Sequence, residues 1–121
     1  MRRKALPVLI VGVSMLLAGC ASTPAPTEQL AVSAAAVSRA DSAGAATLAP
    51  AEMQMAREKL DQARLAMTRE DFDNARNLAQ EAQVDAQLAE AKSRSGKARK
   101  AAGELQEGVR VLRDELDRKN K

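Results

Sequence analysis

Residues 50–89 read PAEMQMAREKLDQARLAMTREDFDNARNLAQEAQVDAQLA, and this stretch decides the fold. Its apolar residues recur at alternating intervals of three and four, which is the spacing of one face of an α-helix. Pro50 suits the first position of a helix, because the backbone N–H there has no helical partner. Asp71 can cap a second helix. The sequence therefore predicts an antiparallel hairpin of a helix over 50–68 and a long helix over 71–119.

Two faces of mostly small apolar residues are expected to meet in this hairpin. The face of the first helix consists of Met53, Ala56, Leu60, Ala63 and Met67. The face of the second helix consists of Phe72, Ala75, Ala79, Ala82, Ala86 and Ala89. Alanine has the highest helix propensity, and its small side chain lets helix axes approach closely. We therefore expect a thin core that depends on close packing.

An alanine-rich segment precedes the hairpin and predicts a further helix over 28–43. Thr27 is available as its N-cap, and Gly44 is expected to end it. Residues 45–49 then form a short connection. The expected apolar face of this helix consists of Leu30, Ala34, Val37 and Ala40 or Asp41. The predicted fold class is all-α, a three-helix arrangement with a long amphipathic C-terminal helix.

The long helix has no proline to stop it and should overhang its partner, at about 70 Å against about 27 Å. It carries a second stripe with heptad spacing, made of Val84, Leu88, Ala91, Ser95, Ala98, Ala102, Leu105, Val109, Leu112 and Leu116. We interpret Leu105, Val109, Leu112 and Leu116 as a helix-association face for a second copy or a partner helix. The alternative is an amphipathic helix that lies on a membrane or in solvent.

A basic collar precedes this association face. Its members are Lys92, Arg94, Lys97, Arg99 and Lys100, and no acidic residue occurs between 91 and 103. One interpretation is contact with an anionic surface, such as lipid head groups or the cell-wall polymer. The other is an ordinary solvated helix face. Nucleic acid is not expected as a partner, because no aromatic residues alternate with the basic ones.

The N-terminus has the pattern of a lipoprotein signal peptide over residues 1–19. A basic head, MRRK, precedes an apolar run over 5–18 that is shorter than the roughly 20 residues of a membrane-spanning helix. The run closes on a lipobox of Leu17, Ala18, Gly19 and Cys20. Cys20 is the predicted lipidation site and the first residue of the mature chain. The alternatives are a buried free thiol, or an ordinary signal peptide with an incidental cysteine.

Removal of the signal would change the charge of the chain. The 19 basic residues fall to 16 when Arg2, Arg3 and Lys4 are lost, which equals the 16 acidic residues. The mature chain therefore has no general attraction to polyanions. Residues 20–27 contain Pro24 and Pro26, and we expect them to form an extended tether that holds the folded part roughly 20 Å from the lipid.

The composition argues against an enzyme. The chain has no histidine, tryptophan or tyrosine, and its only cysteine is the predicted lipidation site. The usual general base and thiol nucleophile are therefore missing. His and Cys metal ligands and a glycine-rich phosphate loop are missing too. We predict no catalytic residue, no metal site and no cofactor other than the covalent lipid on Cys20.

The helical region resembles the bacterial lipoproteins that carry domain of unknown function 4398 (DUF4398). The resemblance covers about 30–103 and rests on Pro50, Ala56, Leu60, Ala63, Asp71, Phe72, Ala75, Leu78, Ala79, Ala82, Asp85, Ala86, Leu88 and Ala89. Related chains usually have glycine before the Asp-aromatic pair, where this one has Glu70. The resemblance implies a helical lipoprotein and brings no catalytic residues. Some relatives continue into a peptidoglycan-binding domain, which this sequence lacks.

A looser similarity connects the chain to the major outer-membrane murein lipoprotein, an alanine-rich helical coil whose terminal lysine is joined to peptidoglycan. Lys121 invites that comparison. We predict a lipoprotein of the outer membrane that faces the periplasm, or of the cell membrane if the source has only one. It would be a non-catalytic structural or protein-interaction module that partners a second copy or an envelope protein. The alternative is a peptidoglycan tether through the basic collar or Lys121.

Overall fold

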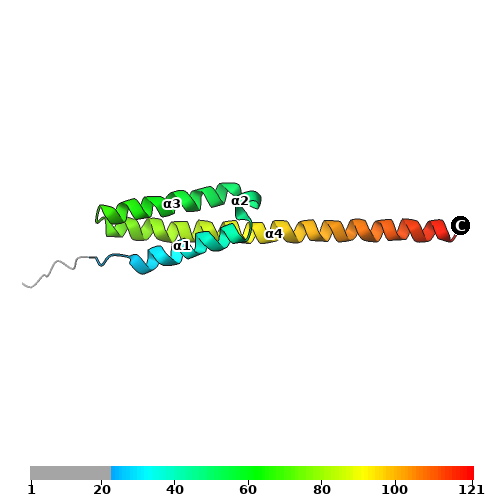
Figure 1. Ribbon diagram of the computed structural model, residues 1–121, viewed down its shortest axis with the longest axis horizontal. Coiled ribbons are helices and arrows are strands. Elements are labelled where there is room, and N and C mark those ends of the chain that lie inside the picture. The colour runs from blue at the N-terminus through cyan, green and yellow to red at the C-terminus, as the bar shows by residue number, and fades with distance from the viewer. Residues whose placement is uncertain (1–22) are drawn as a thin grey trace, which may run out of the picture.

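Three long helices and one short one make up the part of the chain that the structure, a computed structural model, describes, residues 23–121. They are α1 (Thr27–Ser42), α2 (Ala45–Leu48), α3 (Pro50–Thr68) and α4 (Phe72–Lys119). The predicted all-α class is confirmed. Figure 1 shows α1 and α3 along the first half of α4, whose second half projects alone. The predicted signal peptide and Cys20 lie outside the described residues.

The α3–α4 hairpin forms where its local signals predict it. Pro50 occupies the first turn of α3, whose bounds coincide with the expected helix over 50–68. Asp71 caps α4, because its side chain accepts a hydrogen bond from the backbone N–H of Asn74 at 3.4 Å. The turn between the helices places Glu70 at φ 58°, a left-handed conformation that glycine adopts at lower cost.

Alanine dominates the core between these helices. The buried residues of α3 are Met53, Ala56, Leu60, Ala63 and Ala66, and those of α4 are Ala75, Ala79, Ala82, Ala86, Ala89 and Ser93. All of the predicted alanines of the α4 face are fully buried. Met67 and Phe72, which were expected to end the two faces, are only half-buried. Ala66 instead takes the buried position in the last turn of α3, which ends at Thr68.

The first helix differs from its prediction in its start and in its buried face. Pro26 is its N-cap and no side chain caps it, so Thr27 is the first helical residue and not the cap. Its fully buried residues are Ser33, Ala36 and Ala40, whereas the predicted Leu30, Ala34 and Val37 are half-buried at the edges. The helix can bury Ser33 because that hydroxyl donates to the backbone oxygens of Gln29 at 2.8 Å and Ala79 at 2.5 Å.

A tight corner joins α1 to α3. Gly44 has φ 84° and donates its N–H to the Asp41 oxygen at 2.9 Å, which ends α1 as predicted. The Ser93 hydroxyl of α4 donates to the Ala43 oxygen at 2.6 Å and ties the corner down. The expected connection over 45–49 contains the single helical turn α2, with Ala45 buried at its start.

Beyond this corner α4 continues as an isolated helix, which we call the overhang, residues 98–119. Helix α4 is unbroken through Ser93, Gly96 and Gly103, so the overhang continues directly from the bundle. Every residue of the overhang is exposed, and nothing lies within 4 Å of the position that a Cβ on Gly103 would take. The overhang extends about 33 Å past the bundle of α1, α2 and α3 on α4.

Candidate interaction surfaces of the long helix

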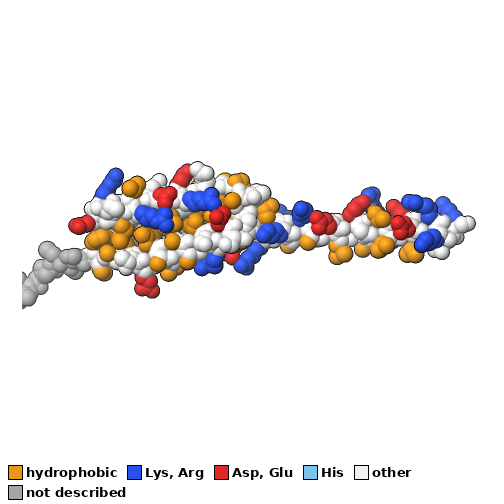
Figure 2. Space-filling model, viewed as in Figure 1, with side chains coloured by type: hydrophobic (Ala, Val, Ile, Leu, Met, Phe, Trp, Pro, Cys, Tyr) orange, Lys and Arg blue, Asp and Glu red, His pale blue; other side chains and the backbone are white. Residues whose placement is uncertain are grey.

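The heptad stripe of α4 is exposed along its whole length. Its ten residues from Val84 to Leu116 are all exposed, although α1 and α3 cover the opposite, alanine-lined face of the same helix. Val84 is 62% exposed beside the bundle, and Leu105 is 70% exposed on the overhang. Figure 2 shows apolar side chains gathered along one side of the overhang. The stripe is therefore a surface that residues 23–121 of one copy leave uncovered.

Charged side chains beside the stripe pair within the helix. Arg110 lies 2.6 Å from Glu107, and Lys100 lies 4.0 Å from Glu104. Exposed pairs of this kind support an isolated helix only weakly, by about 0.2–0.5 kcal/mol each. They leave the predicted association face of Leu105, Val109, Leu112 and Leu116 free to contact another apolar surface.

The basic collar does not form one free patch. Lys92 reaches across to Glu52 of α3, and this hydrogen bond lowers the pKa of the Glu52 carboxyl below its usual value. Arg94 pairs with Glu90 one turn earlier at 2.5 Å. The remaining cations, Lys97, Arg99 and Lys100, lie beside the corner or on the overhang. Two of the five predicted contact residues are thus engaged in holding or flanking the bundle.

A second ion-pair cluster joins α3 to α4 and was not anticipated from the sequence. The Lys59 ammonium lies 2.8 Å from the Asp85 carboxylate and 3.1 Å from that of Glu81. Hydrogen bonds to Asp85 first, and then to Glu81, raise the pKa of Lys59. Because both acids of α4 accept from one lysine of α3, the cluster helps to fix the register of the two helices.

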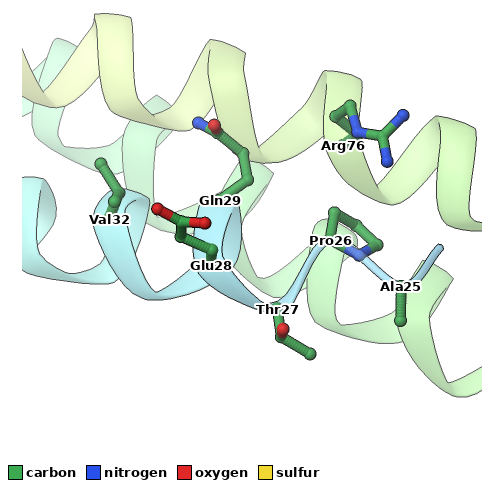
Figure 3. Close-up of a pocket in the computed structure, with 7 residues that line it drawn as sticks. All are labelled: Ala25, Pro26, Thr27, Glu28, Gln29, Val32 and Arg76. Atoms are coloured by element: carbon green, nitrogen blue, oxygen red, sulfur yellow. The ribbon is translucent and has the colours of Figure 1, made fainter.

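The described part of the proline-rich tether, residues 23–27, is docked on the bundle. Figure 3 shows Pro26 and Arg76 on the wall of a shallow pocket where the chain enters α1. Arg76 of α4 donates to the Pro24 oxygen at 3.2 Å, and Pro26 is buried. The chain is therefore already in contact with α4 at residue 24, inside the segment that was expected to form an extended spacer. Nothing in the local sequence distinguishes Arg76 for this role.

The tether enters the bundle at the end that carries the α3–α4 turn, and α4 leads away from that end (Figure 1). Within residues 23–121, no group of three His, Cys, Asp or Glu side chains could hold a metal ion. No helix in this part of the chain is both long and apolar enough to span a bilayer. These features define a helical-bundle protein whose candidate site is an exposed helix face.

The chain belongs to the DUF4398 family, whose description is a domain of unknown function and whose profile matches residues 28–105. It is similar to the crystal structure of a DUF4398 family protein from Pseudomonas aeruginosa PAO1. The identity is 40% over 77% of this chain and 96% of that one, with a TM-score of 0.73. No curated protein matches the sequence. Neither the family description nor the solved relative's name indicates a catalytic activity.

Proposed function

We propose that this protein is a lipid-anchored, non-catalytic interaction module of the cell envelope, and that α4 is its binding element. The observation that carries the proposal is the apolar stripe on a helix that no other part of the described chain covers. Burial of one leucine or valine side chain stabilises a complex by about 1.5–3 kcal/mol. Burial of the four side chains of the association face would therefore supply the apolar part of a helix contact.

The lipid anchor is proposed from the lipobox ending in Cys20. Ala21 follows this cysteine, where an aspartate would resemble an inner-membrane retention signal, so we place the protein in the outer membrane, facing the periplasm. The docked tether supports this arrangement. Only residues 20–23 separate the proposed anchor from the contact at Pro24, which limits the gap to about 14 Å. The turn end of the bundle would then face the lipid and the overhang would point away from it.

Cell fractionation with labelled palmitate tests the anchor. The chain should incorporate label and sediment with outer membranes, and Cys20→Ser should lose both properties. Chemical crosslinking in the same intact cells tests the interaction surface, with Leu112→Asp as the variant and Asp114→Asn on the outer face of α4 as its control. A Leu112→Asp chain that retains the same crosslinked products as the control would contradict the assignment of the stripe.

A second candidate function is a peptidoglycan tether. It is favoured by the position of Lys121, which follows the end of α4 about 70 Å from the α3–α4 turn, and by the exposed cations Arg99 and Lys100. Purified sacculi should then retain the protein, and muramidase should release a chain that carries a muropeptide on Lys121. A protein that stays in the supernatant supports the first function.

A further inference from the structure

The overhang matches part of the core pattern of a parallel two-stranded coiled coil, with Val109 between Leu105 and Leu112. In the heptad register of the stripe, Leu105 and Leu112 occupy d positions, and Val109 and Leu116 occupy a positions. A β-branched residue at a combined with leucine at d favours two parallel strands. All four side chains are between 42% and 70% exposed, so no rearrangement of the bundle is needed to make them available.

The flanking positions permit parallel pairing along the overhang and oppose it nearer the bundle. In a parallel pair, each g residue faces the e residue five positions later in the other strand. From residue 101 onward the facing pairs are Ala101 with Gln106, Gly108 with Arg113 and Glu115 with Asn120, none of which joins like charges. The preceding pair joins Arg94 with Arg99. Repulsion therefore begins where the bundle begins to surround α4.

Antiparallel pairing along the whole overhang fits the charges less well. With Ala98 opposite Leu116, the e position Arg99 of one strand comes opposite Arg113 of the other, and the symmetry repeats this contact. Direction adds a second argument. The tether enters at the start of α4, so two copies anchored in one membrane leaflet point their overhangs the same way. Confinement to a surface also raises the effective concentration of each copy for the other.

We propose that the partner of this surface is a second copy of the chain, paired in parallel and in register through Leu105, Val109, Leu112 and Leu116. The two helices meet from about residue 100 to the end of α4, and the two bundles diverge on the membrane side. This inference rests on the proposed lipid anchor for the direction of the chains. It assigns the exposed stripe beside the bundle, from Val84 to Ser95, no role in the contact.

Disulfide trapping in membranes of cells that produce the full chain tests the pairing. The d position Leu112 is replaced by cysteine, and Asp114→Cys, at the outward f position, is the matched control. Parallel pairing brings the two copies of residue 112 within the 4.4–6.8 Å Cα separation that a disulfide requires. A mild oxidant should convert Leu112→Cys to dimer at least about tenfold faster than Asp114→Cys. Acylation of Cys20 would block its thiol. The same two cysteine variants made in a Cys20→Ser chain check that Cys20 takes no part in the trapped disulfide.

Three results would overturn the proposal. Equal trapping of Leu112→Cys and Asp114→Cys would mean random encounters. A dimer formed only when Ala98→Cys and Leu116→Cys chains are mixed would mean antiparallel pairing. A disulfide between Leu112→Cys and a different protein would mean a foreign partner. Palmitate labelling of the same cells separates this test from that of the anchor. A labelled chain without the trapped dimer refutes the pairing alone, whereas an unlabelled chain that still forms it refutes the anchor alone.

Discussion

Substitution of Ala86 by leucine tests whether close packing of alanines holds the bundle together. Ala86 of α4 is 0% exposed and shares a core cluster with Ala56 of α3 and with Ala36 and Ala40 of α1. Leucine would add three carbon atoms where three helices already meet through single methyl groups. Overpacking of a filled core costs about 1–3 kcal/mol. We expect the upper end, about 3 kcal/mol, because helices on both sides leave the larger side chain no direction in which to turn.

The free energy of unfolding is measured by urea denaturation of a chain that begins at Ala21, and the loss of helix is monitored by far-UV circular dichroism. For about 100 ordered residues, a loss of 3 kcal/mol lowers the melting temperature by roughly 10–15 °C. The matched control is Ala35→Leu, which adds the same atoms on the exposed side of α1. It should change the free energy by less than about 0.5 kcal/mol.

The reasoning is refuted if Ala86→Leu unfolds at the same urea concentration as the parent chain. It is also refuted if Ala35→Leu is equally destabilised, since the loss would then reflect leucine in any helix of this chain and not the distance between helices. Measurements at several protein concentrations separate the effect on the bundle from any effect on pairing.

Other positions make independent predictions for the same urea measurement. Gly44→Ala should destabilise the protein by about 1–2 kcal/mol, because φ 84° is left-handed and strains any side chain. Glu70→Gly should stabilise it by about 0.5–1 kcal/mol, since φ 58° is strained for glutamate, and destabilisation would contradict this account of the turn. The pKa of Glu52 is lowered by Lys92, so the stability that this pair contributes is present at neutral pH. It should be lost as the pH falls through the lowered pKa, below the ordinary 4.5, and Lys92→Gln should flatten that dependence. The pKa of Lys59 is raised, so its contribution should disappear only as the pH rises beyond 10.5.

Local signals predicted the hairpin well. Pro50 and Asp71 act through the first turn of their own helices. The alanine spacing of three and four likewise defines the buried face of each helix without knowledge of its partner. The length of α4 followed from the absence of a later proline. Gly96 and Gly103 left its continuity open, because a single glycine costs a helix only about 1 kcal/mol.

The rest of the architecture depends on contacts between distant residues. Ser33 is buried because it donates to an oxygen 46 residues away, and without that acceptor a serine would favour the surface. The basic collar is divided because Lys92 finds Glu52, 40 residues earlier. The tether is docked because Arg76 reaches Pro24. None of these partners is adjacent in the sequence. Periodicity alone therefore places the buried face of α1 one residue away from its true position, and it groups the five cations as one patch.

Because α4 is unbroken between the bundle and the overhang, the direction in which the overhang faces is fixed relative to the bundle. Each residue inserted between them would turn the distal leucines by about 100° around the axis, whereas seven residues would lengthen the reach by about 10 Å and nearly restore their azimuth. The reach of the helix can therefore change only in steps of about seven residues if its apolar face is to keep its direction. Its tip can be moved outward in whole heptads while the direction in which it faces, relative to the docked prolines, stays almost the same.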